Sequence, residues 1–204
     1  MAGFLTRPWR RRDLMALGAV ALASGLGPAA AAINPAESFV INIADEVMKL
    51  ANSGQTGPGL KSRFAALLNR HINLRNIANY ALGTYRQKLP ASRRTEFYSL
   101  VNNYAASLFV YYIEDFQGSA LDIISTSKQG KYTIIQSAIR SKSGGREQVR
   151  WRLVPSGNGF RVHDVNLKGV WMTISMKDRF TKVLNKSKGD FDALFDELRA
   201  AETW

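Results

Sequence analysis

The feature that most constrains the fold of this chain is a change in hydrophobic periodicity after Gln117-Gly118. Before that point, apolar residues recur every three or four positions, which is typical of amphipathic helices. After it, apolar and polar residues alternate, most clearly where Val149, Trp151 and Leu153 are separated by two arginines. Helical spacing returns near the carboxyl end. This order of helices, strands and helices predicts an α+β domain.

The helical part is divided by glycine, proline and asparagine. The Gly-Pro-Gly segment 57–59 is interpreted as a loop. The fourth expected helix carries a stripe of large side chains, among them Phe97 and Tyr104. Such a stripe either fills a core or lines a cavity for an apolar ligand, and periodicity does not distinguish the two. The expected helices cover 35–51, 60–70, 74–85, 91–116, 175–187 and 191–201.

The strand region is divided by short turns rich in glycine. Short turns between successive strands predict an antiparallel meander. One face of this sheet is expected to pack on the helices and the other to face water, where Arg150, Arg152 and Arg161 would form a basic surface. The expected strands cover 121–127, 132–140, 147–154 and 160–167, and the segment 170–174 could extend the sheet.

The first 32 residues have the three parts of an export signal. Arg10-Arg11-Arg12 precedes an apolar run over 14–26, and small residues follow over 28–32. The paired arginines resemble a twin-arginine signal. The apolar run is shorter than the roughly 20 residues that a membrane-spanning helix needs. We therefore expect a cleaved signal over 1–32 and a single periplasmic domain over 33–204.

The charge of the chain limits its partners. The formal net charge is +12, and cysteine is absent, so neither disulfides nor thiol chemistry enter. A basic domain could bind nucleic acid, an acidic partner or an anionic membrane surface. Export argues against nucleic acid and favours the other two.

No catalytic motif stands out in the sequence. His163 and Asp164 are neighbours on an expected strand, so their side chains should point to opposite faces. His71 is placed at a helix end, where a cation is favoured. Asp190 and Asp192 fit the first turn of the last helix better than a metal site. We expect no catalytic residue, no metal and no cofactor, with His163 and Asp164 as the pair that an enzyme would have to use.

Several segments resemble the MlaC family, the periplasmic phospholipid-binding proteins also called toluene-tolerance auxiliary proteins. The segment 160–170, FRVHDVNLKGV, is the most specific of these. The resemblance follows the chain in order through the segments 79–86, 90–97, 149–153, 160–170 and 191–199.

The resemblance implies an NTF2-like or MlaC-like α+β fold, with helices packed on a curved antiparallel sheet around an apolar cavity. It implies a carrier without enzymatic activity that shuttles phospholipid between two partners. These are an outer-membrane lipoprotein–porin complex and an inner-membrane ABC transporter with an MCE-domain protein. The twin-arginine signal departs from the Sec-type signal common in the family. It leaves a hopanoid-associated branch open, and a ligand-free interaction module is a further alternative.

The acyl tails would lie between sheet and helices, and we expect ten inward-facing positions in the matching segments to form the apolar wall. These are Leu82, Tyr85, Tyr104, Leu108, Tyr112, Val149, Trp151, Val165, Val170 and Met172.

Overall fold

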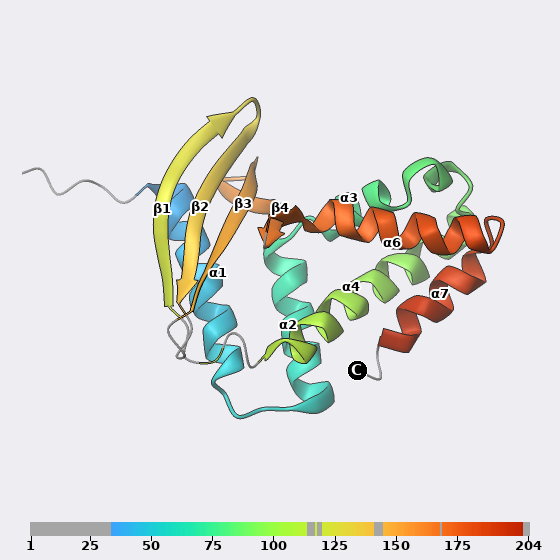
Figure 1. The fold of residues 1–204 in the computed structure, drawn as a ribbon, viewed down its shortest axis with the longest axis horizontal. Coiled ribbons are helices and arrows are strands. Elements are labelled where there is room, and N and C mark those ends of the chain that lie inside the picture. Colours follow the sequence, from blue (N-terminus) through green and yellow to red (C-terminus); the bar gives the residue numbers. More distant parts are fainter. Residues whose placement is uncertain (1–33, 114–116, 118–119, 141–144, 168, 202–204) are drawn as a thin grey trace, which may run out of the picture. The chain divides into compact units, whose positions relative to one another are not determined.

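The computed structural model describes residues 34–113, 117, 120–140, 145–167 and 169–201. Helices occupy both ends of this part of the chain and the strands lie between them (Figure 1). The helices are α1 (Pro35–Ala51), α2 (Gly57–His71), α3 (Leu74–Ala81), α4 (Arg94–Tyr111), α6 (Met172–Lys186) and α7 (Phe191–Ala200), with 3₁₀ turns η1 (Gly83–Gln87) and η2 (Ala91–Arg93). The strands are β1 (Ala120–Gln129), β2 (Tyr132–Arg140), β3 (Arg146–Ser156), β4 (Gly159–Leu167) and β5 (Val170–Trp171).

The five strands form one antiparallel sheet in chain order, β1-β2-β3-β4-β5. The predicted α+β class and the antiparallel meander are therefore confirmed. Glycines make the turns possible: Gly130 and Gly157 both have a positive φ, where other residues are strained.

Four helices differ from their predicted ranges by more than one residue. The segment 57–59 is not a loop but the first turn of α2, because a proline there has no intrahelical N–H bond to lose. The third helix ends at Ala81, and the chain continues through Gly83, whose φ is +54°, into η1. The fourth helix begins at Arg94 after a 3₁₀ turn and ends at Tyr111, and the last residues of its predicted range lie outside the described residues. The sheet extension stops at Trp171, and the next helix, α6, begins at Met172 and not at the predicted residue 175.

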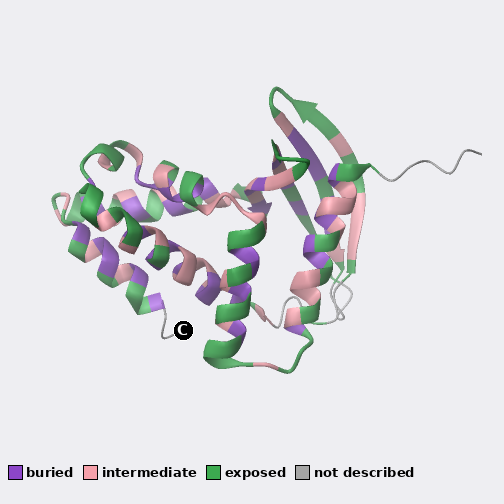
Figure 2. Cartoon of the chain, turned by 180° about the vertical axis from the view of Figure 1, so that it is seen from behind, coloured by how far each residue is buried: buried purple, intermediate pink, exposed green. Residues whose placement is uncertain are grey.

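The buried apolar side chains form two clusters (Figure 2). The helical cluster joins α3, α4, α6 and α7 around Phe97, Phe180 and Phe195, none of which is exposed. The sheet cluster joins α1, α2 and the end of α4 to strands β2, β3 and β4. Within it, the rings of Phe64 and Phe109 stack with centroids 3.6 Å apart. Helix α4 contributes to both clusters and so connects the sheet to the carboxyl-terminal helices.

A β-bulge in β4 changes which side chains face the helices. Leu153 pairs with Val162, whereas Arg152 pairs with Asp164, so His163 is an extra residue in the ladder. Val162 and Val165 both contact the sheet cluster as a result. His163 lies between these two inward-facing positions, at the point where the alternation of faces is interrupted.

Candidate functional site

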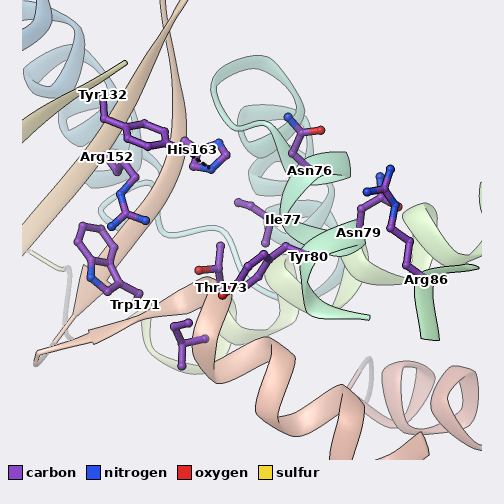
Figure 3. Close-up of a pocket in the computed structure, with 11 residues that line it drawn as sticks. Asn76, Ile77, Asn79, Tyr80, Arg86, Tyr132, Arg152, His163, Trp171 and Thr173 are labelled. Carbon is purple, nitrogen blue, oxygen red and sulfur yellow. Dashed lines mark hydrogen bonds between the residues drawn. The ribbon is translucent and has the colours of Figure 1, made fainter. Parts of the chain in front are cut away.

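A cleft of about 450 Å³ lies between the sheet, α3 and the start of α6 (Figure 3). The sheet presents here the face that carries Arg152, which alternates with the side chains of the sheet cluster. The sequence predicted that this face would be open to water. In the structure, part of it lines the cleft instead. The cleft is lined by Asn76, Ile77, Asn79, Tyr80, Arg86, Tyr132, Arg152, His163, Trp171, Thr173 and Ile174.

The edge of β4 positions the opposite wall. Ile72 forms an isolated parallel bridge with Val162, and the N–H of Asn73 donates to the carbonyl oxygen of Val162 at 2.9 Å. Helix α3 begins at the next residue, Leu74, so this contact holds α3 beside the sheet. The bridge also pairs part of the strand edge that β5 leaves uncovered.

Arg152 is held between two aromatic rings. Its guanidinium carbon lies 4.0 Å from the ring centroid of Trp171 and 5.3 Å from that of Tyr132. Its Nη1 is 3.6 Å from Oδ2 of Asp164, an ion pair that is too long for a hydrogen bond. The described contacts of Arg152 thus place its guanidinium beside two rings and one carboxylate, and they include no hydrogen bond to its N–H groups.

Asp164 lies beneath the cleft and is fully buried. Its Oδ1 accepts from the N–H of Val165 at 2.9 Å and from the N–H of Thr173 at 3.1 Å. Its Oδ2 accepts from the hydroxyl of Thr173 at 2.6 Å. The carboxylate therefore caps the first turn of α6 from β4, which gives the aspartate of the segment 160–170 a structural role.

His163 lines the cleft from the bulge. Its Nε2 lies 3.5 Å from the hydroxyl oxygen of Tyr132, and the two ring centroids are 5.1 Å apart. Burial lowers the pKa of His163; Asp164 opposes this effect, whereas Arg152 and Lys131 add to it. The neutral form of the imidazole is therefore favoured more than in a histidine exposed to water.

The wall formed by α3 and η1 is also rich in donors. Oδ1 of Asn79 accepts from the hydroxyl of Tyr98 at 2.9 Å, which leaves the amide NH₂ of Asn79 to donate elsewhere. Arg86 is exposed and has no hydrogen bond or ion pair among the described residues. Ile77 and Ile174 supply apolar surface. None of the lining residues is an aspartate or a glutamate.

The ten predicted wall residues do not meet at one place. Leu82, Tyr85, Tyr104 and Leu108 belong to or pack on the helical cluster. Three more belong to or pack on the sheet cluster: Val149, Trp151 and Val165. Met172 is half-buried. Tyr112 and Val170 are each 51% exposed.

Two positions thus differ from the inward-facing prediction. Tyr112 follows the last residue of α4, where the helical stripe has ended. Val170 begins the two-residue strand β5 directly after the turn at Gly169. None of the ten residues lines the cleft.

The cleft residues were missed because they are scattered through the sequence. Asn76 and Tyr80 are one turn apart on α3, Arg152 is on β3 and Trp171 is on β5. One signal was available: alternation places Arg152 opposite to Trp151. The bulge at His163 gave no signal, since it depends on the pairing of β3 with β4.

Within the described ranges, no helix is long and apolar enough to cross a membrane. The same residues contain no group of three histidine or acidic side chains placed to hold a metal ion.

Comparison with known proteins agrees with the fold. The MlaC protein family matches residues 41–200. This chain belongs to the MlaC family. The chain also resembles the solved structure of a phospholipid-binding protein from Ralstonia solanacearum, in complex with a phospholipid. That match has a TM-score of 0.69 at 15% sequence identity and covers 83% of this chain and 98% of the other. A search of curated proteins found no match.

Proposed function

We propose that this MlaC-family chain is a periplasmic carrier that binds a phospholipid, with the acyl tails between the sheet and helices α1, α2 and α4. The observation that carries the proposal is its fold, which it shares with a protein solved in complex with a phospholipid. Membership of the MlaC family supports the same function. On this proposal the chain performs no chemistry on its ligand.

The sheet cluster is the apolar region suited to the tails. Val149, Trp151 and Leu153 project from β3 toward α1, α2 and Phe109 of α4. The indole N–H of Trp151 donates to Oγ of Ser137 at 2.9 Å, and this hydroxyl donates to the carbonyl of Val149. The polar atom of the indole is therefore satisfied, and the rest of the ring is apolar wall. Burial of an acyl chain contributes about 0.8 kcal/mol per CH₂ group.

The remaining parts of the proposal concern export and partners. Residues 1–32 would be the twin-arginine-type signal and 33–204 the single lipid-binding domain. The carrier would shuttle between an outer-membrane lipoprotein–porin complex and an inner-membrane ABC transporter with an MCE-domain protein. Its positive charge suits both anionic headgroups and acidic docking surfaces.

A comparison of two core variants tests the location of the tails. Trp151→Ala should reduce the phospholipid that is extracted with the purified protein, as measured by mass spectrometry. Leu184→Ala is the control, because Leu184 is also buried but belongs to the helical cluster. Equal lipid in Trp151→Ala and the wild-type protein would argue against this site. A hopanoid in the extract would support a carrier function with a different ligand, the alternative that the twin-arginine signal leaves open.

A further inference from the structure

We infer that the hairpin of β4 and β5 is a membrane-contact surface, by which the protein binds reversibly to a bilayer that contains anionic lipids. The contact is with the surface of the bilayer and not with the lipid that the protein is proposed to carry, so it does not rest on the proposed function. Two observations carry it: an exposed apolar pair at the end of the hairpin, and a tryptophan flanked by two arginines directly behind that pair.

The end of the hairpin is apolar and exposed. Leu167 and Val170 face each other as the last pair of the ladder between β4 and β5, and Gly169, with a φ of +85°, allows the tight turn between the strands. Leu167 is 38% exposed and Val170 is 51% exposed. Leu167 also pairs with Val149 of β3, which is buried. An apolar row therefore crosses three strands from the sheet cluster to the surface, where its two outer members are accessible.

The next row of the same ladders carries an indole and positive charge. Arg150 pairs with Asn166, and Asn166 pairs with Trp171, so these residues lie one position behind the apolar row and on the other face of the sheet. The ring centroid of Trp171 is 4.0 Å from Cζ of Arg152, its neighbour in Figure 3, and 5.7 Å from Cζ of Arg150. Tryptophan is enriched at the level of the headgroups in membrane proteins, where its apolar ring and its N–H group are both satisfied.

The charge around the hairpin favours an anionic surface. Strand β3 carries three arginines, at positions 146, 150 and 152, and one carboxylate, Glu147. The carboxylate of β4, Asp164, is fully buried and already accepts three hydrogen bonds. Arg150 is exposed and takes part in no ion pair among the described residues. Its charge is therefore available to anionic headgroups, which attract arginine and lysine near the membrane surface.

The two rows together have the amphipathic character of an interfacial membrane anchor. In such anchors apolar side chains enter the boundary between headgroups and acyl chains, while cationic side chains stay among the headgroups. Leu167 and Val170 fit the first role, and Arg150 fits the second, because a guanidinium binds phosphate groups well. Since two apolar side chains bury little area, the contact should be weak on a neutral bilayer and should depend on anionic lipid.

Trp171 makes the contact observable in the purified protein. Vesicles of phosphatidylglycerol mixed with phosphatidylcholine should move the tryptophan emission to shorter wavelength, and Trp171→Phe should abolish this shift. Binding to vesicles of phosphatidylcholine alone should be weaker by about fivefold or more, because the attraction of even one arginine for the surface is lost. Equal binding to both kinds of vesicle, or binding to neither, would overturn the membrane-contact surface.

Cosedimentation of variants with the phosphatidylglycerol vesicles locates the contact. Val170→Asp should weaken binding by about tenfold or more, because it removes apolar surface and adds a charge of the same sign as the lipid. Ile124→Asp is the matched control, since Ile124 is 48% exposed but lies on β1, at the other edge of the sheet. Both positions are exposed, so both variants should fold. Equal binding by the two variants would contradict the assignment.

A second pair of variants tests the charge. Arg150→Gln should weaken binding to the same vesicles by about fivefold. Arg63→Gln removes the same charge from an exposed position on α2 and should have a smaller effect. Equal binding by these two variants would show that net charge alone attracts the protein, which would overturn the role of the hairpin.

The lipid content of the purified protein is a separate measurement. Vesicle binding by a protein whose organic extract holds no lipid would keep the membrane-contact surface and argue against the carrier. Lipid in the extract of a protein that does not bind the vesicles would overturn the membrane-contact surface and leave the carrier in place.

Discussion

Replacement of Asp164 should destabilise the protein more than replacement of any exposed carboxylate. The side chain is fully buried and accepts hydrogen bonds from two backbone N–H groups and from the hydroxyl of Thr173. It also faces Arg152 at 3.6 Å. Asp164→Ala leaves the two Thr173 donors without their acceptor and the Arg152 guanidinium without its ion-pair partner.

The magnitude follows from these contacts. A hydrogen bond to a charged group contributes about 1.5–3 kcal/mol, and a buried donor left unpaired costs a comparable amount. Removal of one partner of a fully buried ion pair typically costs about 3–5 kcal/mol, and the loss here is smaller because the Arg152 side chain is 27% exposed. Because the contacts share one carboxylate, they do not add independently, and we expect Asp164→Ala to lower the free energy of unfolding by about 3–5 kcal/mol.

Urea denaturation provides the measurement. The midpoint should fall while the slope of the unfolding free energy with denaturant stays constant. Asp178→Ala is the matched control, because Asp178 is exposed on α6, and its effect should be within about 0.5 kcal/mol. Thr173→Val alone should lower the free energy of unfolding by part of the amount lost in Asp164→Ala. When it is added to Asp164→Ala, the further loss should be small, because the shared hydrogen bond is already absent. A loss below about 1 kcal/mol for Asp164→Ala would refute the role of this carboxylate as the link between β4 and α6.

Two other predictions concern stability. Because the folded state lowers the pKa of His163, the unfolded chain binds more protons, so stability should fall as the pH drops below the ordinary histidine pKa. In His163→Gln, the urea midpoint should depend less on pH than in the wild-type protein. The range to measure is about pH 5 to 8, on both sides of the ordinary histidine pKa of about 6.5. The same pH dependence in both proteins would contradict this prediction. Gly83→Ala should lower the free energy of unfolding by about 1–2 kcal/mol, because Gly83 has a φ of +54° and an added Cβ would lie 3.4 Å from Lys177 and Thr181. Thermal melting measures this loss. An unchanged melting midpoint would contradict the prediction.

The order of elements could be predicted because each carries a local signal. Alternation of Val149, Trp151 and Leu153 marks β3, and the glycines between strands require positive φ at turns such as Gly157. The structure confirms these features. The first turn of α2 was missed because Gly-Pro-Gly favours loops locally, whereas Leu60 and Phe64 hold it as a helix through burial in the sheet cluster.

The site could not be predicted to the same extent. Periodicity shows which side of a helix is apolar, but not which of two clusters that side will join. Tyr104 and Trp151 both proved buried, one in the helical cluster and the other in the sheet cluster. The cleft depends on the bulge at His163 and on the bridge between Ile72 and Val162, contacts between segments far apart in the chain.

Native mass spectrometry of the purified protein would show directly whether it carries a lipid. A phospholipid carrier should give a species heavier than the polypeptide by the mass of one phospholipid, which dissociates to the bare chain on activation. A folded protein that carries no lipid, and that takes up none from vesicles of phosphatidylethanolamine and phosphatidylglycerol, would contradict the carrier function.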